Sequence, residues 1–150
     1  MALKITFVSV DSRDFKALAE RLDAYYFSLV GDIQNRYAET NRPENMTALA
    51  VAYEEGTPIA CGAWKHIDET TAELKRLFVL PEFRRKGVAR RMIAVLEGNA
   101  AAAGIRRMIL ETAVDTTDSH KLYLSAGYQV TDYYGSPAGA ENCLCFYRDI

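Results

Sequence analysis

The sequence lacks any apolar run that approaches the roughly 18 residues needed to cross a membrane as a helix. Its first ten residues, MALKITFVSV, alternate like a strand and carry neither the apolar core nor the small-residue cleavage site of a signal peptide. We therefore expect a cytoplasmic protein with no membrane partner.

Cysteine and histidine are also scarce, with three cysteines and two histidines in 150 residues. Cys61, Cys143 and Cys145 lie in apolar, strand-like runs, and an odd number without paired spacing argues against a disulfide framework. Cys143 and Cys145 are too close for a usual zinc knuckle, and no histidine pair accompanies them. We expect small buried thiols in a reducing compartment, and no metal.

The chain has no large excess of either charge. A net charge of −2 and an isoelectric point near 5.7 argue against a nucleic-acid partner. The basic residues gather instead around positions 84–91. A slightly acidic chain with one basic patch suits a small anionic ligand better than a polyanion.

Nothing divides the sequence into parts, because it has no internal repeat, low-complexity tract or Pro/Gly/Ser-rich linker. We expect residues 1–150 to form one domain, which at this length buries roughly two-thirds of its unfolded surface.

Strand-like and helix-like patterns alternate along the chain. The segment from 32 to 45 is polar and ambiguous, and is compatible with a short second helix and a loop. The expected strands are 3–10, a hairpin over 47–64 with its turn at residues 55–58, 70–80, 105–112, 128–134 and 142–149; the expected helices are 12–31, 88–103 and 117–128.

The stretch PEFRRKGVARRM (81–92) places three basic residues directly before a helix. The first N–H groups of a helix have no internal partners, and with the helix dipole they form an anion site. Gly87 lets the chain turn and an anion approach, and Ala89 is small for the same reason. The stretch predicts a phosphate or pyrophosphate site; the alternative is a solvated helix end. No P-loop or G-x-G-x-x-G pattern is present.

The pattern R-x-x-G-x-A, filled by Arg84, Gly87 and Ala89, resembles the coenzyme A pyrophosphate loop of the GNAT acetyltransferase family, Q/R-x-x-G-x-G/A. ELKRLFVLPEFRRKGVARRMI is similar to that family's fourth strand, loop and third helix. ILETAVDTTDSHKLYLSAGYQV is similar to its fifth strand, fourth helix and sixth strand, with Tyr123 and Gly127 in a Y-x-x-x-G-[FY] pattern. The resemblance covers essentially the whole chain and extends to small bacterial N-acetyltransferases.

The resemblance implies an α+β GNAT fold, with a mixed, mostly antiparallel sheet of six to seven strands, a central parallel pair and about four helices. It implies acetyl transfer from the cosubstrate acetyl-coenzyme A to a primary amine of a small molecule or protein, by direct attack in a ternary complex. The alternative is a GNAT-fold module that senses acetyl-coenzyme A or binds another protein without turnover.

The resemblance also implies which residues hold the cofactor. The backbone at the end of the fourth strand would bind the pantetheine arm, with the Val79 N–H as an oxyanion donor, while the same side chains pack in the core. Thr116 stands where the family often has an asparagine that contacts coenzyme A. The implied cofactor residues are Phe78, Val79, Leu80, Arg84, Arg85, Lys86, Gly87, Val88, Ala89 and Thr116.

Tyr123 is the candidate general acid, since a phenol keeps its proton at neutral pH and can donate it to the leaving thiolate. The alternative is an ordinary core aromatic. Glu73 is the leading candidate base, with Glu111, His66 and His120 as rivals.

Strict alternation along the strand would put Glu73, Lys75, Leu77 and Val79 on one face unless a bulge intervenes. The alternative for Glu73 is an exposed glutamate paired with a lysine.

The acceptor wall is expected from the first helix, the 32–45 segment and the 135–142 segment. Tyrosines beside carboxylates would suit a cation there; the alternative is that they form the surface of a homodimer. These residues are Tyr25, Tyr26, Tyr37, Tyr133, Tyr134, Asp32, Glu39 and Glu141.

Overall fold

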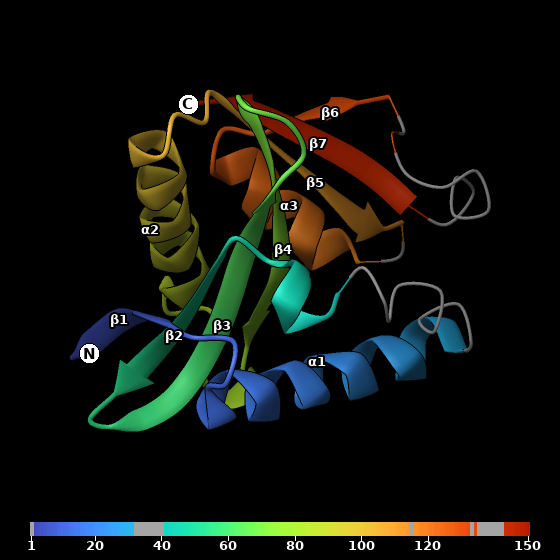
Figure 1. The fold of residues 1–150 in the computed structure, drawn as a ribbon. Coiled ribbons are helices and arrows are strands. Elements are labelled where there is room, and N and C mark those ends of the chain that lie inside the picture. Colours follow the sequence, from blue (N-terminus) through green and yellow to red (C-terminus); the bar gives the residue numbers. More distant parts are fainter. Residues whose placement is uncertain (1, 32–40, 115, 133, 135–142) are drawn as a thin grey trace.

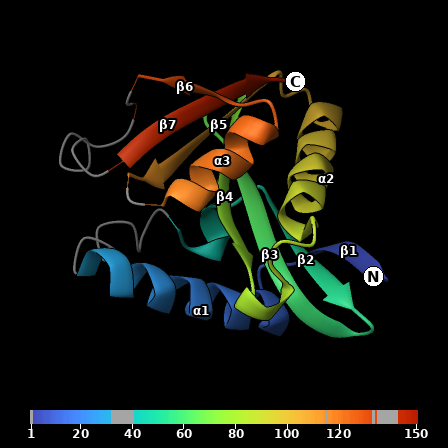
Figure 2. The same cartoon turned by 180° about the vertical axis from the view of Figure 1, so that it is seen from behind.

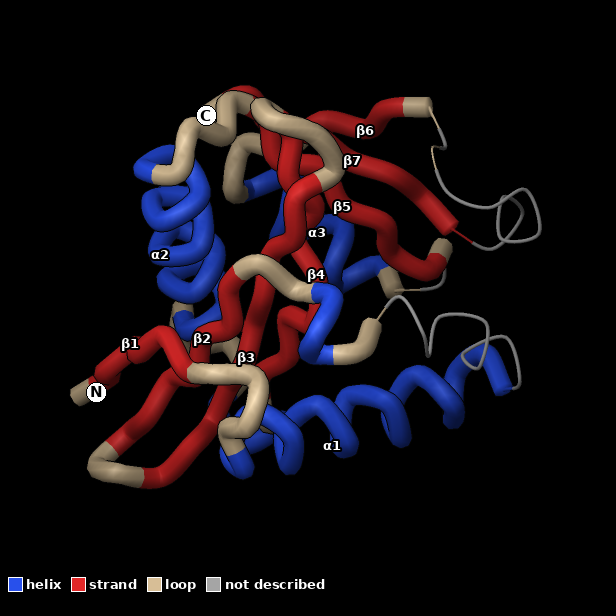
Figure 3. Tube along the Cα trace, viewed as in Figure 1, coloured by secondary structure: helices blue, strands red, loops and turns tan. Residues whose placement is uncertain are grey.

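The computed structural model describes residues 2–31, 41–114, 116–132, 134 and 143–150. In this part of the chain, strands and helices alternate as the sequence patterns predict (Figure 3). The elements in chain order are β1 (Leu3–Val8), α1 (Arg13–Val30), η2 (Pro43–Asn45), β2 (Ala48–Glu54), β3 (Thr57–His66), β4 (Thr71–Val79), η3 (Pro81–Phe83), α2 (Val88–Ala102), β5 (Arg107–Ala113), α3 (Thr117–Ser125), β6 (Gln129–Thr131) and β7 (Cys143–Asp149).

The strands form one seven-stranded sheet in the order β1-β2-β3-β4-β5-β7-β6. Only β4 and β5 pair in parallel among these neighbours, and the other pairs are antiparallel. The expected mixed sheet with a central parallel pair is therefore confirmed. The described residues contain three α-helices rather than about four. The expected second helix falls mostly on 32–40, outside the described residues, and 43–45 form a single 3-10 turn.

Helices cover both faces of the sheet (Figures 1 and 2). Helix α1 begins where the Ser12 hydroxyl accepts a hydrogen bond from the Phe15 N–H, and it packs Phe15, Leu18 and Leu22 into one core cluster. Helices α2 and α3 contribute to a second cluster on the opposite face, where α2 buries Val88, Met92 and Leu96 at helical spacing.

The two parallel strands separate soon after they meet. Their pairing runs only from Thr71, opposite Arg107, to Glu73, opposite Ile109. Beyond Glu73, β4 pairs only with β3, so the edge of β4 that faces β5 lies open. The strands thus form a wedge whose closed end lies at Glu73.

A β-bulge interrupts β4 inside this wedge. The register with β3 slips by one residue between the Cys61–Phe78 and Ala63–Lys75 pairs, and Arg76 adopts a φ of +58°. The predicted alternation is therefore wrong: Leu77 packs in the cluster on the α2 side, whereas Arg76 turns to α1 and donates hydrogen bonds there.

The bulge is what allows two consecutive cationic residues, Lys75 and Arg76, to share the α1 side with Glu73. The Arg76 guanidinium bonds the Ala19 carbonyl at 3.0 Å and Asp23 at 2.8 Å. Val79, like Leu77, packs on the α2 side instead. The face of β4 that looks toward α1 is consequently far more polar than a regular strand would make it.

Candidate active site

The loop before α2 has the geometry of an anion cradle. Arg85 and Gly87 both adopt left-handed backbone conformations, with φ of +63° and +80°. Left-handed residues beside helical ones turn successive N–H groups toward one concave surface. Helix α2 then begins without a side-chain cap and without an acidic residue in its first turn. Its first amides therefore remain available to a ligand.

The Arg84 side chain is held by β4 and α1. Its Nε donates to the Val79 carbonyl at 2.9 Å, and its guanidinium lies 5.4 Å from the Tyr25 ring centre and 5.5 Å from that of Phe78. Arg84 thereby joins the loop to α1 and β4. All four loop residues, Arg84, Arg85, Lys86 and Gly87, are exposed. A contact between Arg84 and pyrophosphate stays a prediction.

The end of β4 combines a packed side-chain layer with an available backbone edge. The side chains of Phe78, Val79 and Leu80 are buried. The Leu80 N–H donates to the Ile59 carbonyl of β3, so by alternation the Val79 amide and carbonyl point away from β3, toward the wedge. The carbonyl accepts from the Arg84 Nε, which leaves the Val79 N–H as the available group. The geometry thus allows the side chains of this segment to pack in the core while its backbone binds the pantetheine arm.

Glu73 is buried, with 7% of its surface exposed. Its Oε1 lies 3.5 Å from the Lys75 Nζ, and its Oε2 accepts a 2.6 Å hydrogen bond from the Tyr134 hydroxyl. Burial lowers the pKa of Lys75, and the Glu73 carboxylate opposes that shift. The pairing with a lysine is as the alternative reading expected, but the expectation of an exposed glutamate is wrong.

The sequence indicated Tyr134 only as one of several tyrosines of the acceptor wall, and did not predict its contact with Glu73. Burial of its hydroxyl, followed by the negative charge of Glu73, raises its pKa well above the ordinary range. No spacing pattern links positions 73 and 134, so only the tertiary fold could reveal the pair.

Tyr123 lies on α3 with its ring against Tyr128 and Phe146, at centroid distances of 5.9 and 6.0 Å. Burial raises the pKa of its hydroxyl, and the hydroxyl of Tyr26 on α1 adds to the shift. The phenol is therefore protonated at neutral pH, as a general acid must be. The hydroxyls of Tyr123 on α3 and Tyr26 on α1 are therefore close enough to interact electrostatically, although the two helices cover opposite faces of the sheet.

The rival bases differ in their surroundings. Glu111 is half-buried on β5 and interacts electrostatically with Lys75 and Tyr134, so it belongs to the same cluster as Glu73. The ring of His66 is exposed and hydrogen-bonded to Thr47, and that of His120 to the Ala113 carbonyl. The ring of His66 also lies against Trp64, and that of His120 against Phe146, in the described part of the chain.

Other predicted residues contribute less to this geometry. The Thr116 hydroxyl donates to the Ala113 carbonyl at 2.7 Å, so its contact with coenzyme A stays a prediction. Five wall residues, Asp32, Tyr37, Glu39, Tyr133 and Glu141, lie outside the described residues. Within the described ranges, no set of three His, Cys, Asp or Glu side chains is placed to hold a metal ion, and no helix has the length and apolar character to cross a membrane.

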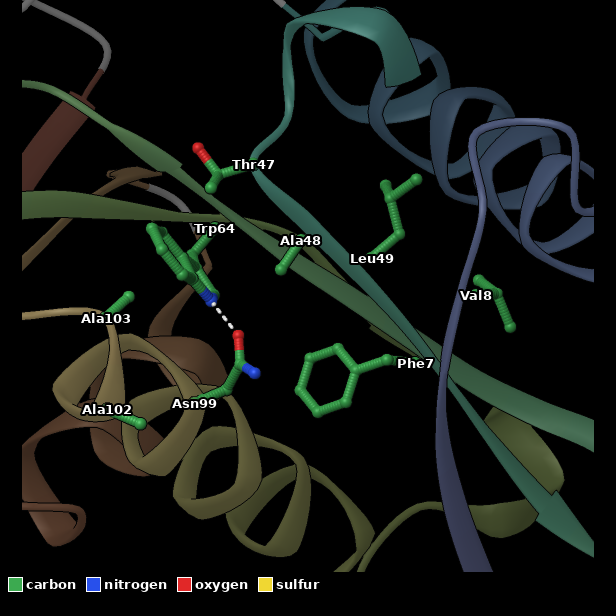
Figure 4. Close-up of a pocket in the computed structure, with 9 residues that line it drawn as sticks. All are labelled: Phe7, Val8, Thr47, Ala48, Leu49, Trp64, Asn99, Ala102 and Ala103. Atoms are coloured by element: carbon green, nitrogen blue, oxygen red, sulfur yellow. Dashed lines mark hydrogen bonds between the residues drawn. The ribbon is translucent and has the colours of Figure 1, made fainter.

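A separate surface pocket of about 500 Å³ lies near the C-terminal end of α2 (Figure 4). Phe7, Ala48 and Trp64 line it, and the Trp64 indole N–H donates to Asn99 at 2.9 Å. Since α2 has 15 residues, this pocket is about 20 Å from the anion cradle at the start of the helix. It is not part of the site described above.

The sequence matches the family model described as the acetyltransferase (GNAT) family over residues 13–128. The chain belongs to this family. It is 34% identical over 137 residues to the IAA acetyltransferase of Azospirillum brasilense, an alignment that covers 86% of this chain and 85% of the relative. The aminoglycoside N(6')-acetyltransferase type 1 of Salmonella typhimurium is 36% identical over 59 residues, or 39% of this chain and 41% of that enzyme.

The GNAT fold is also seen in a solved structure, that of the PaiA N-acetyltransferase of Thermoplasma acidophilum in complex with coenzyme A. It superimposes with a TM-score of 0.77 at 18% identity, over 100% of both chains. The resemblance read from the sequence is therefore confirmed, and so is its implication that this GNAT protein is an acetyl-coenzyme A-dependent N-acetyltransferase.

Proposed function

We propose that this enzyme acetylates a primary amine of a small molecule by direct attack within a ternary complex. The observation that carries the proposal is the buried carboxylate of Glu73 at the closed end of the wedge between β4 and β5. A carboxylate held there lies beside the available backbone edge of β4, where a bound thioester would present its carbonyl group.

The choice of a small molecule as acceptor rests on the tyrosines of the expected acceptor wall and on the relatives. Tyr25 and Tyr134 keep 40% and 38% of their surfaces exposed, so they offer aromatic faces to an amine that arrives as a cation. The names of the two relatives given above each contain a small molecule, IAA in one and aminoglycoside in the other. Tyr26, half-buried beside Tyr25, would extend the same wall.

Each step then has a residue. The loop amides from Gly87 onward, with Arg85 and Lys86, would hold the diphosphate of acetyl-coenzyme A, and the Val79 N–H would polarise the thioester carbonyl. The bound ammonium first gives one proton to solvent. The neutral amine then attacks the acetyl carbon, and its nitrogen becomes positively charged as the C–N bond forms. That nitrogen loses a proton toward Glu73, the C–S bond breaks, and the thiolate takes the proton of Tyr123.

Release of free thiol tests the function directly. The enzyme is incubated with acetyl-coenzyme A and, in turn, an aminoglycoside, spermidine, an aromatic amine and a short peptide with a free amino terminus. We expect amine-dependent thiol release with at least one small molecule. Binding of acetyl-coenzyme A without thiol release from any acceptor would favour the non-catalytic sensor instead.

Two substitutions test the assigned roles. With the best acceptor from that panel, Glu73→Gln and Tyr123→Phe should each lower kcat about 100-fold, the size typical of losing a general base or acid. Neither should change the affinity for coenzyme A by more than about twofold, since neither group is assigned to the diphosphate or pantetheine.

Matched variants decide between these residues and their alternatives. Glu111→Gln removes the rival carboxylate on β5, and Tyr147→Phe removes an exposed phenol that bonds Gln129 at 3.2 Å. Both should retain kcat within a few fold. A larger loss for Glu111→Gln than for Glu73→Gln would move the base to β5.

A further inference from the structure

The buried base does not itself face the acceptor. Glu73 is only 7% exposed, and both of its carboxylate oxygens already have partners. Oε1 is within 3.5 Å of the Lys75 ammonium, and Oε2 accepts the Tyr134 hydroxyl at 2.6 Å. The oxygens keep further lone pairs, but so little of the side chain is exposed that an acceptor nitrogen has little room to reach the carboxylate directly.

Tyr134 spans the distance from this buried carboxylate to the surface. The residue is 38% exposed, yet its hydroxyl ends on Glu73. A phenol oxygen that donates its proton still carries lone pairs and can accept another. Tyr134 can therefore receive a proton on one side while it delivers its own on the other.

We propose that Tyr134 is a proton relay between the acceptor nitrogen and Glu73. This inference rests on the proposed function and adds to it a residue that touches the acceptor. As the C–N bond forms, an N–H bond of the acceptor breaks and its proton joins the Tyr134 oxygen. The original Tyr134 O–H bond breaks in the same step, and that proton joins Oε2 of Glu73. Tyr134 ends the step neutral, and Glu73 ends it as a carboxylic acid.

The charges around the pair favour a relay over a free tyrosinate base. Lys75 from β4 lies beside Glu73, with Lys65 of β3 next along. Glu111 of β5 and Cys145 of β7 interact electrostatically with Tyr134. The carboxylates raise the pKa of Tyr134 further above that of an exposed phenol, in addition to the effect of burial. Because a persistent tyrosinate is disfavoured there, its proton must leave as another arrives.

Tyr134→Phe tests the relay, since it removes one oxygen and keeps the ring. Single-turnover rates of acetyl transfer are measured in mixtures of light and heavy water with the best acceptor of the amine panel. For the unmodified enzyme we expect a curved dependence on the deuterium fraction, as two protons move in one step. The variant should be about 10- to 100-fold slower, with a linear dependence, and should bind coenzyme A unchanged.

Tyr53→Phe is the matched control. The Tyr53 hydroxyl also donates to a carboxylate at 2.6 Å, that of Asp14, but at the opposite end of α1 from Tyr25 and Tyr26. This variant should keep the wild-type rate within about twofold, and its rate should keep the curved dependence on the deuterium fraction. A slower Tyr53→Phe variant would show that losing any phenol–carboxylate bond slows the enzyme.

The outcomes separate the relay from the proposed function. Tyr134→Phe at the wild-type rate would overturn the relay while acetyl transfer itself stands. A slower variant that keeps the curved dependence would overturn it too, because the loss would then come from structure and not from proton transfer. Failure of the unmodified enzyme to release thiol would remove the proposed function, and the relay with it.

Discussion

At the scale of single residues, the interior of this enzyme holds several groups in the protonation state that burial favours. Burial raises the pKa of Tyr123 and of the Cys61 thiol, the latter to about 12. Cys61 and Cys145 are buried, as the sequence predicted, whereas Cys143 is only half-buried. Such groups stay protonated at neutral pH, but they make the free energy of unfolding fall at alkaline pH.

Cys61 gives a measurable form of this linkage. Its folded-state pKa of about 12 lies above the value near 8.5 of an exposed thiol, so the folded chain binds more protons than the unfolded chain between them. Its contribution to stability is complete below about pH 8.5 and is lost as the pH rises toward 12. From this thiol alone, we expect the free energy of unfolding in urea to fall by about 1 kcal/mol between pH 9 and 10.

Cys61→Ala isolates the thiol in that experiment. The variant is less stable at neutral pH because it leaves a small cavity, but between pH 9 and 10 its stability should fall by about 1 kcal/mol less than that of the unmodified protein. The fall that both proteins share comes from buried tyrosines such as Tyr123 and Tyr134, whose folded-state pKa values lie above the value near 10 of an unfolded phenol. Parallel curves for both proteins across this range would contradict the assignment to Cys61.

At the scale of secondary structure, the anion cradle depends on one glycine. Gly87 combines a φ of +80° with open space where a Cβ would lie. Gly87→Trp would fill the space in front of the α2 amides, and calorimetry should then detect no binding of coenzyme A. The fold should persist, since the position is exposed.

Gly87→Ala is the control for backbone strain. Both variants force a side chain into the left-handed region, at a cost of roughly 1–2 kcal/mol, so their melting temperatures should fall alike. Alanine leaves room for a diphosphate, and coenzyme A should still bind. Equal affinities for the two variants would place the cofactor away from this loop.

The elements themselves were largely predictable, because each depends on a local pattern. Ser12 and Gly31 bound α1 as the sequence indicated, and Gly127 follows α3 with a φ of +95° and a Tyr128 N–H that bonds the Tyr123 carbonyl. The bulge at Arg76 was not predictable, because it depends on how β3 pairs with β4.

The candidate site was predictable only in part for the same reason. Gly87 and Tyr123 belong to motifs, so the sequence alone nominated them. The bond from Tyr134 to Glu73 joins residues 61 positions apart, and the docking of Arg84 on Val79 and Tyr25 joins the loop to α1. Contacts of this kind follow from tertiary packing and leave no period or spacing in the sequence.

At the scale of the whole molecule, the wedge between β4 and β5 brings the cradle, Tyr123 and the Glu73–Tyr134 pair into one arrangement. The cradle begins α2 on one face, while α1 supplies Tyr25 and Tyr26 from the other. The pocket beside Phe7 lies at the far end of α2 and takes no part in it. Coenzyme A bound at the cradle would therefore run along the open edge of β4 into the sheet.

A crystal structure with coenzyme A bound measures this arrangement most directly. The account predicts the diphosphate on the amides that begin at Gly87, the pantetheine arm beside the Val79 backbone, and the sulfur within hydrogen-bonding reach of the Tyr123 hydroxyl. A diphosphate seated elsewhere, or a sulfur that points away from Tyr123 and the wedge, would contradict it.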